Sequence, residues 1–151
     1  MVEATHPCVG LDFIDDAPFR LVTTAEFPVL PAQLFEVLSE TPAWPEWFDV
    51  TRIILMRGKV TAVEEFIAWK PSSHLAFRFN DCSDPRVRAS AEEYRIEPTA
   101  QGCQLTSTKA PNPVGASRFP RWVARRVMMH THRRALVSLR RYTDQRFGTV
   151  L

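Results

Sequence analysis

The last third of the chain has the hydrophobic period of one long amphipathic helix. At about 100° per residue, one side collects mostly apolar residues: Ala124, Met128, His132, Ala135, Leu139 and Tyr142. The opposite side collects charged residues: Arg126, Arg133, Arg140 and Asp144. No proline follows Pro120, and the next glycine is Gly148. The pattern predicts a helix of roughly seven turns that ends at Gly148 and needs a large apolar surface beneath it.

Between residues 50 and 109 the period is two. Alternating runs, separated by short turns that contain Pro, Gly or Ser, predict five consecutive strands: residues 50–57, 60–70, 74–79, 87–97 and 103–109. The turns are too short to hold helices, so neighbouring strands are predicted to be antiparallel.

The first part of the chain predicts one strand and two short helices. Residues 19–27 alternate and are rich in β-branched side chains, as is typical of a strand. Pro31 stands where a helix can begin, because its missing N–H is not needed at the first helical position, and residues 32–40 continue that helix. Residues 43–48, with three aromatic side chains, predict a short helix or turn.

Three segments carry a family resemblance. They are FPVLPAQLFEVLSETPAWPEW after the first strand, VEEFIAWKPSSHLAFRF as a strand, turn and strand, and YRIEPTAQGCQLT before the last strand. With this order of elements, residues 19–145 resemble the START-like (SRPBCC, Bet v 1-like) superfamily, and within it the polyketide cyclase/dehydrase-type branch. The resemblance implies an α+β helix-grip fold. In that fold a curved antiparallel sheet of about six strands wraps around the long C-terminal helix, with two short helices after the first strand.

The chain departs from that family between Trp47 and Val60. Members usually have two strands in this interval, joined by a Gly-rich hairpin, but here only residues 48–59 separate the two positions. We therefore predict that one strand is lost or very short and that an edge of the sheet is exposed. An exposed edge can pair with a second copy of the chain, so a homodimer through this edge is one hypothesis.

Strand alternation predicts which side chains face the helix. In residues 60–69 the odd positions are bulkier, so Glu65 is predicted to point inward and Glu64 to solvent. The turn at residues 71–73 then predicts three cross-strand pairs: Trp69–Leu75, Ile67–Phe77 and Glu65–Phe79. The next two strands are predicted to face inward with Arg88, Glu92, Tyr94, Ile96, Cys103, Leu105 and Ser107, and outward with Gln104, Thr106 and Thr108.

A hollow between sheet and helix is the predicted functional site. Its predicted ligand-binding residues are Phe35, Trp47, Ile67, Trp69, Phe77, Phe79, Glu92, Ile96, Leu105, Met128, Ala135 and Leu139. If the protein is an enzyme, Glu65, Tyr94 and His132 are the predicted catalytic residues, because a desolvated carboxylic acid beside a His can exchange protons near neutral pH. In the alternative interpretation, which we favour, Glu65 and Arg88 neutralise each other and His132 is a hydrogen-bonded helix histidine.

Composition narrows the class of protein. A chain of 151 residues with 45% hydrophobic and 24% charged residues is typical of one soluble globular domain. We expect residues 1–18 to form a flexible arm and residues 19–147 a single domain. No apolar run approaches the ~20 residues that span a bilayer, and the N-terminus lacks the pattern of a secretory signal. Three cysteines without paired spacing predict reduced thiols in the cytoplasm.

The net charge of +2 is unevenly distributed. Residues 111–151 hold nine arginines and one acid, a sum of +8, whereas the other residues hold ten basic and sixteen acidic side chains, a sum of −6. A basic helix can bind phosphates or anionic lipid headgroups, or its arginines can simply solvate the surface and pair with the acidic body. We favour solvation and predict no nucleic-acid partner, because no aromatic residues interleave the outward arginines.

Other motifs argue for little chemistry. His130 and His132 diverge by about 200° on a helix and cannot bind one ion, so no metal and no cofactor are predicted. Cys103 with His132 lacks a third orienting group, and a buried thiol is usually inert. The sequence therefore predicts, first, a module that binds a small hydrophobic molecule, either a lipid or a polyketide-like compound, without stable membrane insertion. A polyketide cyclase/dehydratase-type enzyme is the alternative, and a subunit that binds a partner through the sheet edge or the Arg-rich helix is the third hypothesis.

Overall fold

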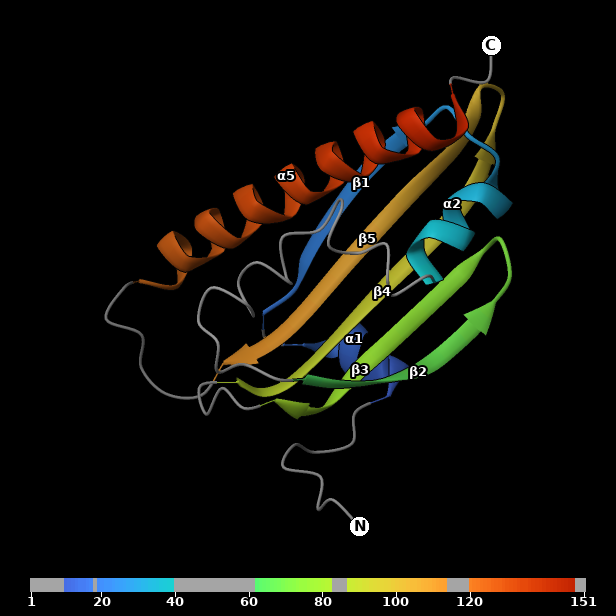
Figure 1. Ribbon diagram of the computed structural model, residues 1–151. Helices are drawn as coiled ribbons and strands as arrows, with labels where there is room; N and C mark the ends of the chain where they lie inside the picture. Colours follow the sequence, from blue (N-terminus) through green and yellow to red (C-terminus); the bar gives the residue numbers. More distant parts are fainter. Residues whose placement is uncertain (1–9, 18, 40–61, 83–86, 114–119, 149–151) are drawn as a thin grey trace.

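The computed structural model describes residues 10–17, 19–39, 62–82, 87–113 and 120–148. Its elements, in chain order, are α1 (Leu11–Asp16), β1 (Leu21–Phe27), α2 (Pro31–Ser39), β2 (Ala62–Lys70), β3 (His74–Cys82), β4 (Val87–Thr99), β5 (Gly102–Pro113) and α5 (Arg121–Phe147). Figure 1 shows α5 lying obliquely across the sheet, with α2 beside it. The strand predicted at residues 50–57 and the aromatic turn at 43–48 lie outside the described residues.

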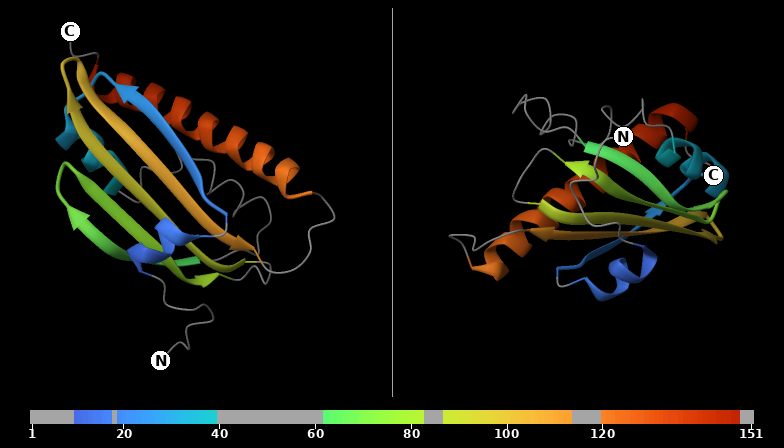
Figure 2. Two further views of the ribbon diagram at one scale, coloured as in Figure 1. Left: turned by 180° about the vertical axis from the view of Figure 1, so that it is seen from behind. Right: turned by 90° about the horizontal axis from the view of Figure 1, so that it is seen from below.

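The five described strands form one antiparallel sheet in the order β1-β5-β4-β3-β2. The sheet is curved, with α2 and α5 on one face, which we call the concave face, and α1 on the other, the convex face (Figure 2). A curved antiparallel sheet that holds a long C-terminal helix is the predicted helix-grip fold, which is confirmed. Strands β2 and β1 end the sheet on its two sides within the described residues, and a homodimer through an edge stays a prediction.

Short-range sequence signals explain several boundaries. The side chain of Gln33 accepts a hydrogen bond from the N–H of Leu30 (2.9 Å), which satisfies a donor at the start of α2. The β2–β3 turn has Pro71 second and Ser72 third with φ 65°, the combination of a type II turn. Gly102 begins β5 at φ 148°, where an added Cβ would lie 2.1 Å from the carbonyl oxygen of Phe27. Only glycine fits there.

Helix α5 ends as predicted. Gly148 has φ 74° and donates its N–H to the carbonyl of Asp144 (3.0 Å). The buried stripe of the helix consists of His132, Ala135, Leu136, Leu139 and Thr143. Three of these residues were predicted, and Leu136 and Thr143 extend the stripe. Met128, also predicted on the stripe, is 36% exposed.

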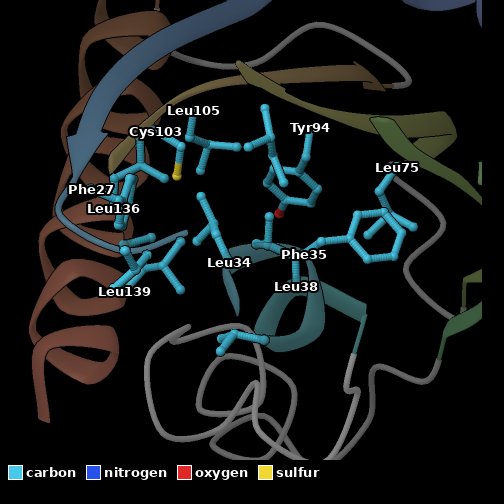
Figure 3. Packing of buried hydrophobic residues seen from close by; sticks show 14 of the residues in the cluster. Phe27, Leu34, Phe35, Leu38, Leu75, Tyr94, Cys103, Leu105, Leu136 and Leu139 are labelled. Carbon is cyan, nitrogen blue, oxygen red and sulfur yellow. The ribbon is translucent and has the colours of Figure 1, made fainter. Parts of the chain in front are cut away.

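The main core lies between the concave face, α2 and α5 (Figure 3). Its buried side chains come from all these elements and include Phe27, Leu34, Phe35, Leu38, Leu75, Phe77, Tyr94, Ile96, Cys103, Leu105, Leu136 and Leu139. Because aliphatic and aromatic side chains from sheet and helices interdigitate here, burial of this cluster is the main force that holds α5 against the sheet.

A second cluster lies on the convex face and corrects one prediction. Residues 11–16, within the segment expected to be a flexible arm, form α1, and Ile14 (1% exposed) packs against Ala76 and Ala91. Thr108 was predicted to face water, but it is 3% exposed. It lies opposite Glu93 on the face that α1 covers, which explains why it is buried.

The β2–β3 pairing also differs from the prediction. Trp69 pairs with Leu75 as predicted, but Phe66 rather than Ile67 pairs with Phe77, because the register shifts between Phe66 and Ala68. One extra residue in a strand reverses the alternation beyond it. Phe66 therefore contacts Phe77 on the concave face, and Ile67 packs with the convex cluster.

The same shift changes the position of Glu65. The predicted Glu65–Phe79 pair is wrong: Glu64 pairs with Phe79, and Glu65 pairs with Arg78. For Glu65 and Phe79 the structure describes only this backbone pairing. The pairing that placed Glu65 in line with Phe77 and Trp69 is therefore absent.

Candidate functional site

The sheet register brings two rows of side chains across the concave face. The first row runs from β2 to β1 through Phe66, Phe77, Glu92, Lys109 and Leu21. The second row runs through Trp69, Leu75, Tyr94, Ser107 and Thr23. Aromatic side chains thus gather towards β2, and polar side chains gather on β4 and β5, where α5 adds His132.

Glu92 is the buried anion of this site. It is 7% exposed, and its two carboxylate oxygens have different partners. Lys109 Nζ lies 3.2 Å from Oε1, and the hydroxyl of Tyr94 donates to Oε2 over 3.0 Å. A buried carboxylate needs both a countercharge and hydrogen bonds to offset its desolvation, and these two neighbours supply them.

His132 stands next to that group, in a network of hydroxyls. Ser107 Oγ lies 2.8 Å from Nε2, and Thr23 Oγ1 lies 3.4 Å from Nδ1. The Thr23 hydroxyl donates its hydrogen to the sulfur of Met129 (3.2 Å), so its oxygen is left to accept from Nδ1–H. The network therefore assigns the Nδ1–H tautomer, in which Nε2 accepts from the Ser107 hydroxyl.

The surroundings keep His132 neutral. Burial, followed by the positive charge of Lys109, lowers the pKa of His132 from 6.5 to about 4. A neutral imidazole with so low a pKa is a weak base near neutral pH. The sequence predicted proton exchange near pH 7 at this residue, and the desolvated position beside a cation argues against it.

An aromatic group continues from the core to the surface at β2. Trp69 meets Phe35 of α2 edge to face at 5.3 Å between ring centroids, and Phe66 meets Trp69 at 5.0 Å and Phe77 at 6.3 Å. Phe35 and Phe77 are buried, but Trp69 is 50% and Phe66 43% exposed. Large aromatic surfaces that remain half exposed while packed on the core are available to an apolar ligand.

The structure places the predicted site residues in different environments. Six of them are buried in the main core: Phe35, Phe77, Ile96, Leu105, Ala135 and Leu139. Tyr94, Glu92 and His132 form the polar group just described. Met128 and Trp69 are partly exposed, Ile67 lies with the convex cluster, and Trp47 is outside the described residues.

Sequence reasoning missed Lys109 and Thr23. The alternation Cys103, Leu105, Ser107 continues to Lys109, so the sequence pattern could have predicted that Lys109 faces inward. Thr23 lies an even number of residues from Phe27 in β1, so alternation places both side chains on the same face and could have predicted Thr23 as well. The expected ion pair of Glu65 with Arg88 involves side chains that the structure does not describe, and the ion pair seen on the concave face is Glu92–Lys109.

The two other candidate motifs are the histidine pair of α5 and the thiol of Cys103. His130 is exposed, whereas His132 is buried, as their spacing on the helix predicted. Burial, with the Glu26 carboxylate as the second cause, raises the pKa of the Cys103 thiol to about 11, so this free cysteine stays protonated and unreactive at neutral pH. Among the described residues, no group of three His, Cys, Asp or Glu side chains is arranged to hold a metal ion.

Comparison with known proteins gives the family. The chain is 42% identical over 161 aligned positions to "Uncharacterized protein Rv2574" of Mycobacterium tuberculosis, covering 95% of this chain and 96% of that protein. The chain belongs to the same protein family as Rv2574. "Uncharacterized protein Mb2604" of Mycobacterium bovis matches at the same identity and coverage. No protein-family model matches the chain.

Solved structures give the fold. A "START superfamily protein" from Mycobacterium smegmatis superposes with a TM-score of 0.65 at 8% identity, over 84% of this chain and 98% of that one. Protein CV1439 from Chromobacterium violaceum superposes with a TM-score of 0.64 at 8% identity, with the same coverage. The START-like fold predicted from the sequence is therefore confirmed. In the described part of the chain, no helix has the length and apolar character needed to cross a membrane.

Proposed function

We propose that this protein binds a small hydrophobic molecule, a lipid or a polyketide-like compound, on the concave face of the sheet, the side that α2 and α5 cover. The observation that carries the proposal is the aromatic group of Trp69 and Phe66, half exposed and continuous with buried Phe35 and Phe77. Exposed aromatic surface costs free energy in water, and an apolar ligand that covers it recovers roughly 25 cal/mol per Å² of apolar area.

The polar side chains support a ligand that has one polar end. Glu92, Lys109 and Tyr94 lie one and two strands away from Phe77 and Leu75 in the same rows. A few convergent polar groups beside an apolar surface are typical of sites that fix the orientation of a small molecule. We expect the apolar part of the ligand on the aromatic group and its polar end towards β4 and β5. We also propose that the protein is cytoplasmic, because its three cysteines lack paired spacing.

Native mass spectrometry of the purified protein, with extraction of anything bound, tests the proposal directly. A co-purifying hydrophobic molecule would support it and identify the ligand class. Titration with that molecule then tests the site: Trp69→Ala is expected to weaken binding about tenfold, which corresponds to about 1.4 kcal/mol.

Val22→Ala is the matched control, because Val22 is 40% exposed and pairs with Thr108, on the other face of the sheet. Its affinity is expected to stay within about twofold of the unaltered protein, since one exposed contact is worth little. Equal loss in both variants, or no loss in Trp69→Ala, would place the ligand elsewhere.

The second candidate is a polyketide cyclase/dehydratase-type enzyme that uses Glu65, Tyr94 or His132 as acid and base. The short Ser107–His132 hydrogen bond favours it, whereas the low pKa of His132 disfavours it. His132→Gln and Glu65→Gln separate the two functions. A pure binding protein keeps its ligand affinity within a few fold and shows no turnover, but an enzyme loses most of its rate with its fold intact.

A further inference from the structure

The outer side of α5 is the most strongly basic exposed surface that the structure describes. Its exposed arginines include Arg126, Arg133, Arg134 and Arg141. At about 100° per residue they lie roughly 100–200° around the helix from the buried His132, on the side away from the stripe that His132, Ala135 and Leu139 form. No described helix or strand lies beyond this side of α5 (Figure 1).

These four arginines differ from the other arginines of the helix. Arg140 lies 3.6 Å from Asp144 and donates to the carbonyl of Glu26, Arg125 donates to the carbonyl of Arg20, and Arg146 pairs with Glu36 at 2.6 Å. Within the described residues, the four outer arginines have no carboxylate partner. Their charges are therefore available to a partner outside the chain.

Apolar side chains lie among the outer arginines. Trp122, Val127 and Val137 are 64%, 61% and 60% exposed. Trp122, Arg126, Arg133 and Val137 follow one another at spacings of four, seven and four residues, which stacks them along one side of the helix. A surface pocket on this side is lined by Val137, Arg140, Arg141, Asp144 and Gln145.

Charge is unevenly distributed along the chain, and the positive charge is concentrated in the segment that contains α5. Residues 111–151 sum to +8, and the rest of the chain sums to −6. Near a negatively charged plane, the basic outer side of α5 is attracted to the plane. Each basic side chain close to an anionic membrane contributes about fivefold to the partition coefficient.

We propose that the outer side of α5 docks on the surface of an anionic lipid bilayer. The outer arginines bind the phosphate and carboxylate groups of the headgroups, and Trp122, Val127 and Val137 rest at the headgroup–acyl boundary. The helix stays folded on the sheet and lies parallel to the membrane plane, because its opposite stripe is buried in the core. The docking is peripheral and reversible, and it requires no insertion of the helix.

Two other partners fit this surface less well. Single-stranded nucleic acid needs aromatic side chains between the cations for bases to stack on, and the outer arginines are separated by valines, with one tryptophan at the end of the row. A second copy of the chain would bring two rows of arginines together across a twofold axis, and like charges repel.

Co-sedimentation with vesicles tests the proposal. The probes are vesicles of phosphatidylcholine alone and vesicles with about 30% phosphatidylserine, at low and at physiological salt. Binding is expected only to the anionic vesicles and is expected to weaken steeply with salt. Arg133→Glu and Arg141→Glu are each expected to lower the partition coefficient about 25-fold, because reversal replaces one attraction with a repulsion of similar size.

Lys70→Glu is the matched control. It changes the net charge by the same amount at an exposed residue of the β2–β3 turn, near the opposite edge of the sheet from β1. Its partition coefficient is expected to stay within about threefold. Circular dichroism confirms that each variant is folded.

Three results would overturn the proposal. The first is no binding to anionic vesicles at low salt. The second is an equal loss in Lys70→Glu and Arg133→Glu, which would mean that net charge alone drives association. The third is binding to single-stranded DNA or to a second copy of the chain that Arg133→Glu abolishes while vesicle binding is unchanged.

Discussion

Glu92 and Glu93 are neighbours on β4, and both are buried, but they point to opposite faces of the sheet. Glu92, on the concave face, is held by Lys109 (3.2 Å) and Tyr94 (3.0 Å). Glu93, on the convex face, is held by His74 (2.7 Å) and Arg95 (2.8 Å). Two similar carboxylates therefore have two partners each, and the two environments differ in how far those partners are from water.

The accessibility of the partners separates the two sites. The side chain of Lys109 is 17% exposed, whereas that of Arg95 is 56% exposed. Water reaches the Glu93 pair through Arg95 and screens it, but it scarcely reaches the Glu92 pair. The concave site thus depends on one poorly hydrated cation beside a neutral histidine, whereas in the convex site Glu93 and His74 are buried and Arg95 reaches the solvent. We infer that strong electrostatic effects belong to the concave face.

The largest expected effect comes from removing the cation of each pair. Lys109→Met is expected to lower the free energy of unfolding by about 3–4 kcal/mol, because it leaves Glu92 buried without a countercharge. Arg95→Met is expected to cost less, about 1 kcal/mol, because Arg95 is 56% exposed and Glu93 keeps its contact with His74. Urea unfolding at neutral pH measures both values. Equal losses would show that the two carboxylates are equivalent.

The pH dependence of stability is expected to report His132. The folded protein protonates this residue near pH 4, whereas the unfolded chain does so near 6.5. Between these values the unfolded state binds more protons, so stability is lost as the pH falls through this window, by at most about 3 kcal/mol. His132→Gln removes the group and is expected to flatten the curve. An unchanged slope in that variant would assign the pH dependence to other groups.

A smaller effect is expected at the hydroxyl that contacts His132. Ser107→Ala removes the 2.8 Å hydrogen bond to Nε2 and leaves a buried nitrogen without its donor, at a cost of about 1–2 kcal/mol in unfolding free energy. Thr106→Ala, the neighbouring residue on the other face of β5, is expected to cost less than about 0.5 kcal/mol. If Thr106→Ala proves the more costly variant, the Ser107–His132 contact contributes little.

Much of this fold was determined by local sequence. The alternation of Tyr94 with Ile96, and of Cys103 with Leu105, identified the inward faces of β4 and β5, and the helical period identified α5 and its end at Gly148. These patterns suffice because side-chain direction follows the backbone period within one element. The polar members Tyr94, Glu92, Ser107 and His132 were found in the same way, since they share the faces of their apolar neighbours.

Tertiary structure alone decided which of those polar groups meet. The contact between Ser107 and His132 depends on how α5 lies across the sheet, and the Glu92–Lys109 pair depends on the register of β4 against β5. The shift at Phe66, which exchanged Phe66 for Ile67 on the concave face, arises between two strands and has no marker in either. The order in α1 also comes from packing, because a six-residue helix is too short to be stable without the surface that Ile14 covers.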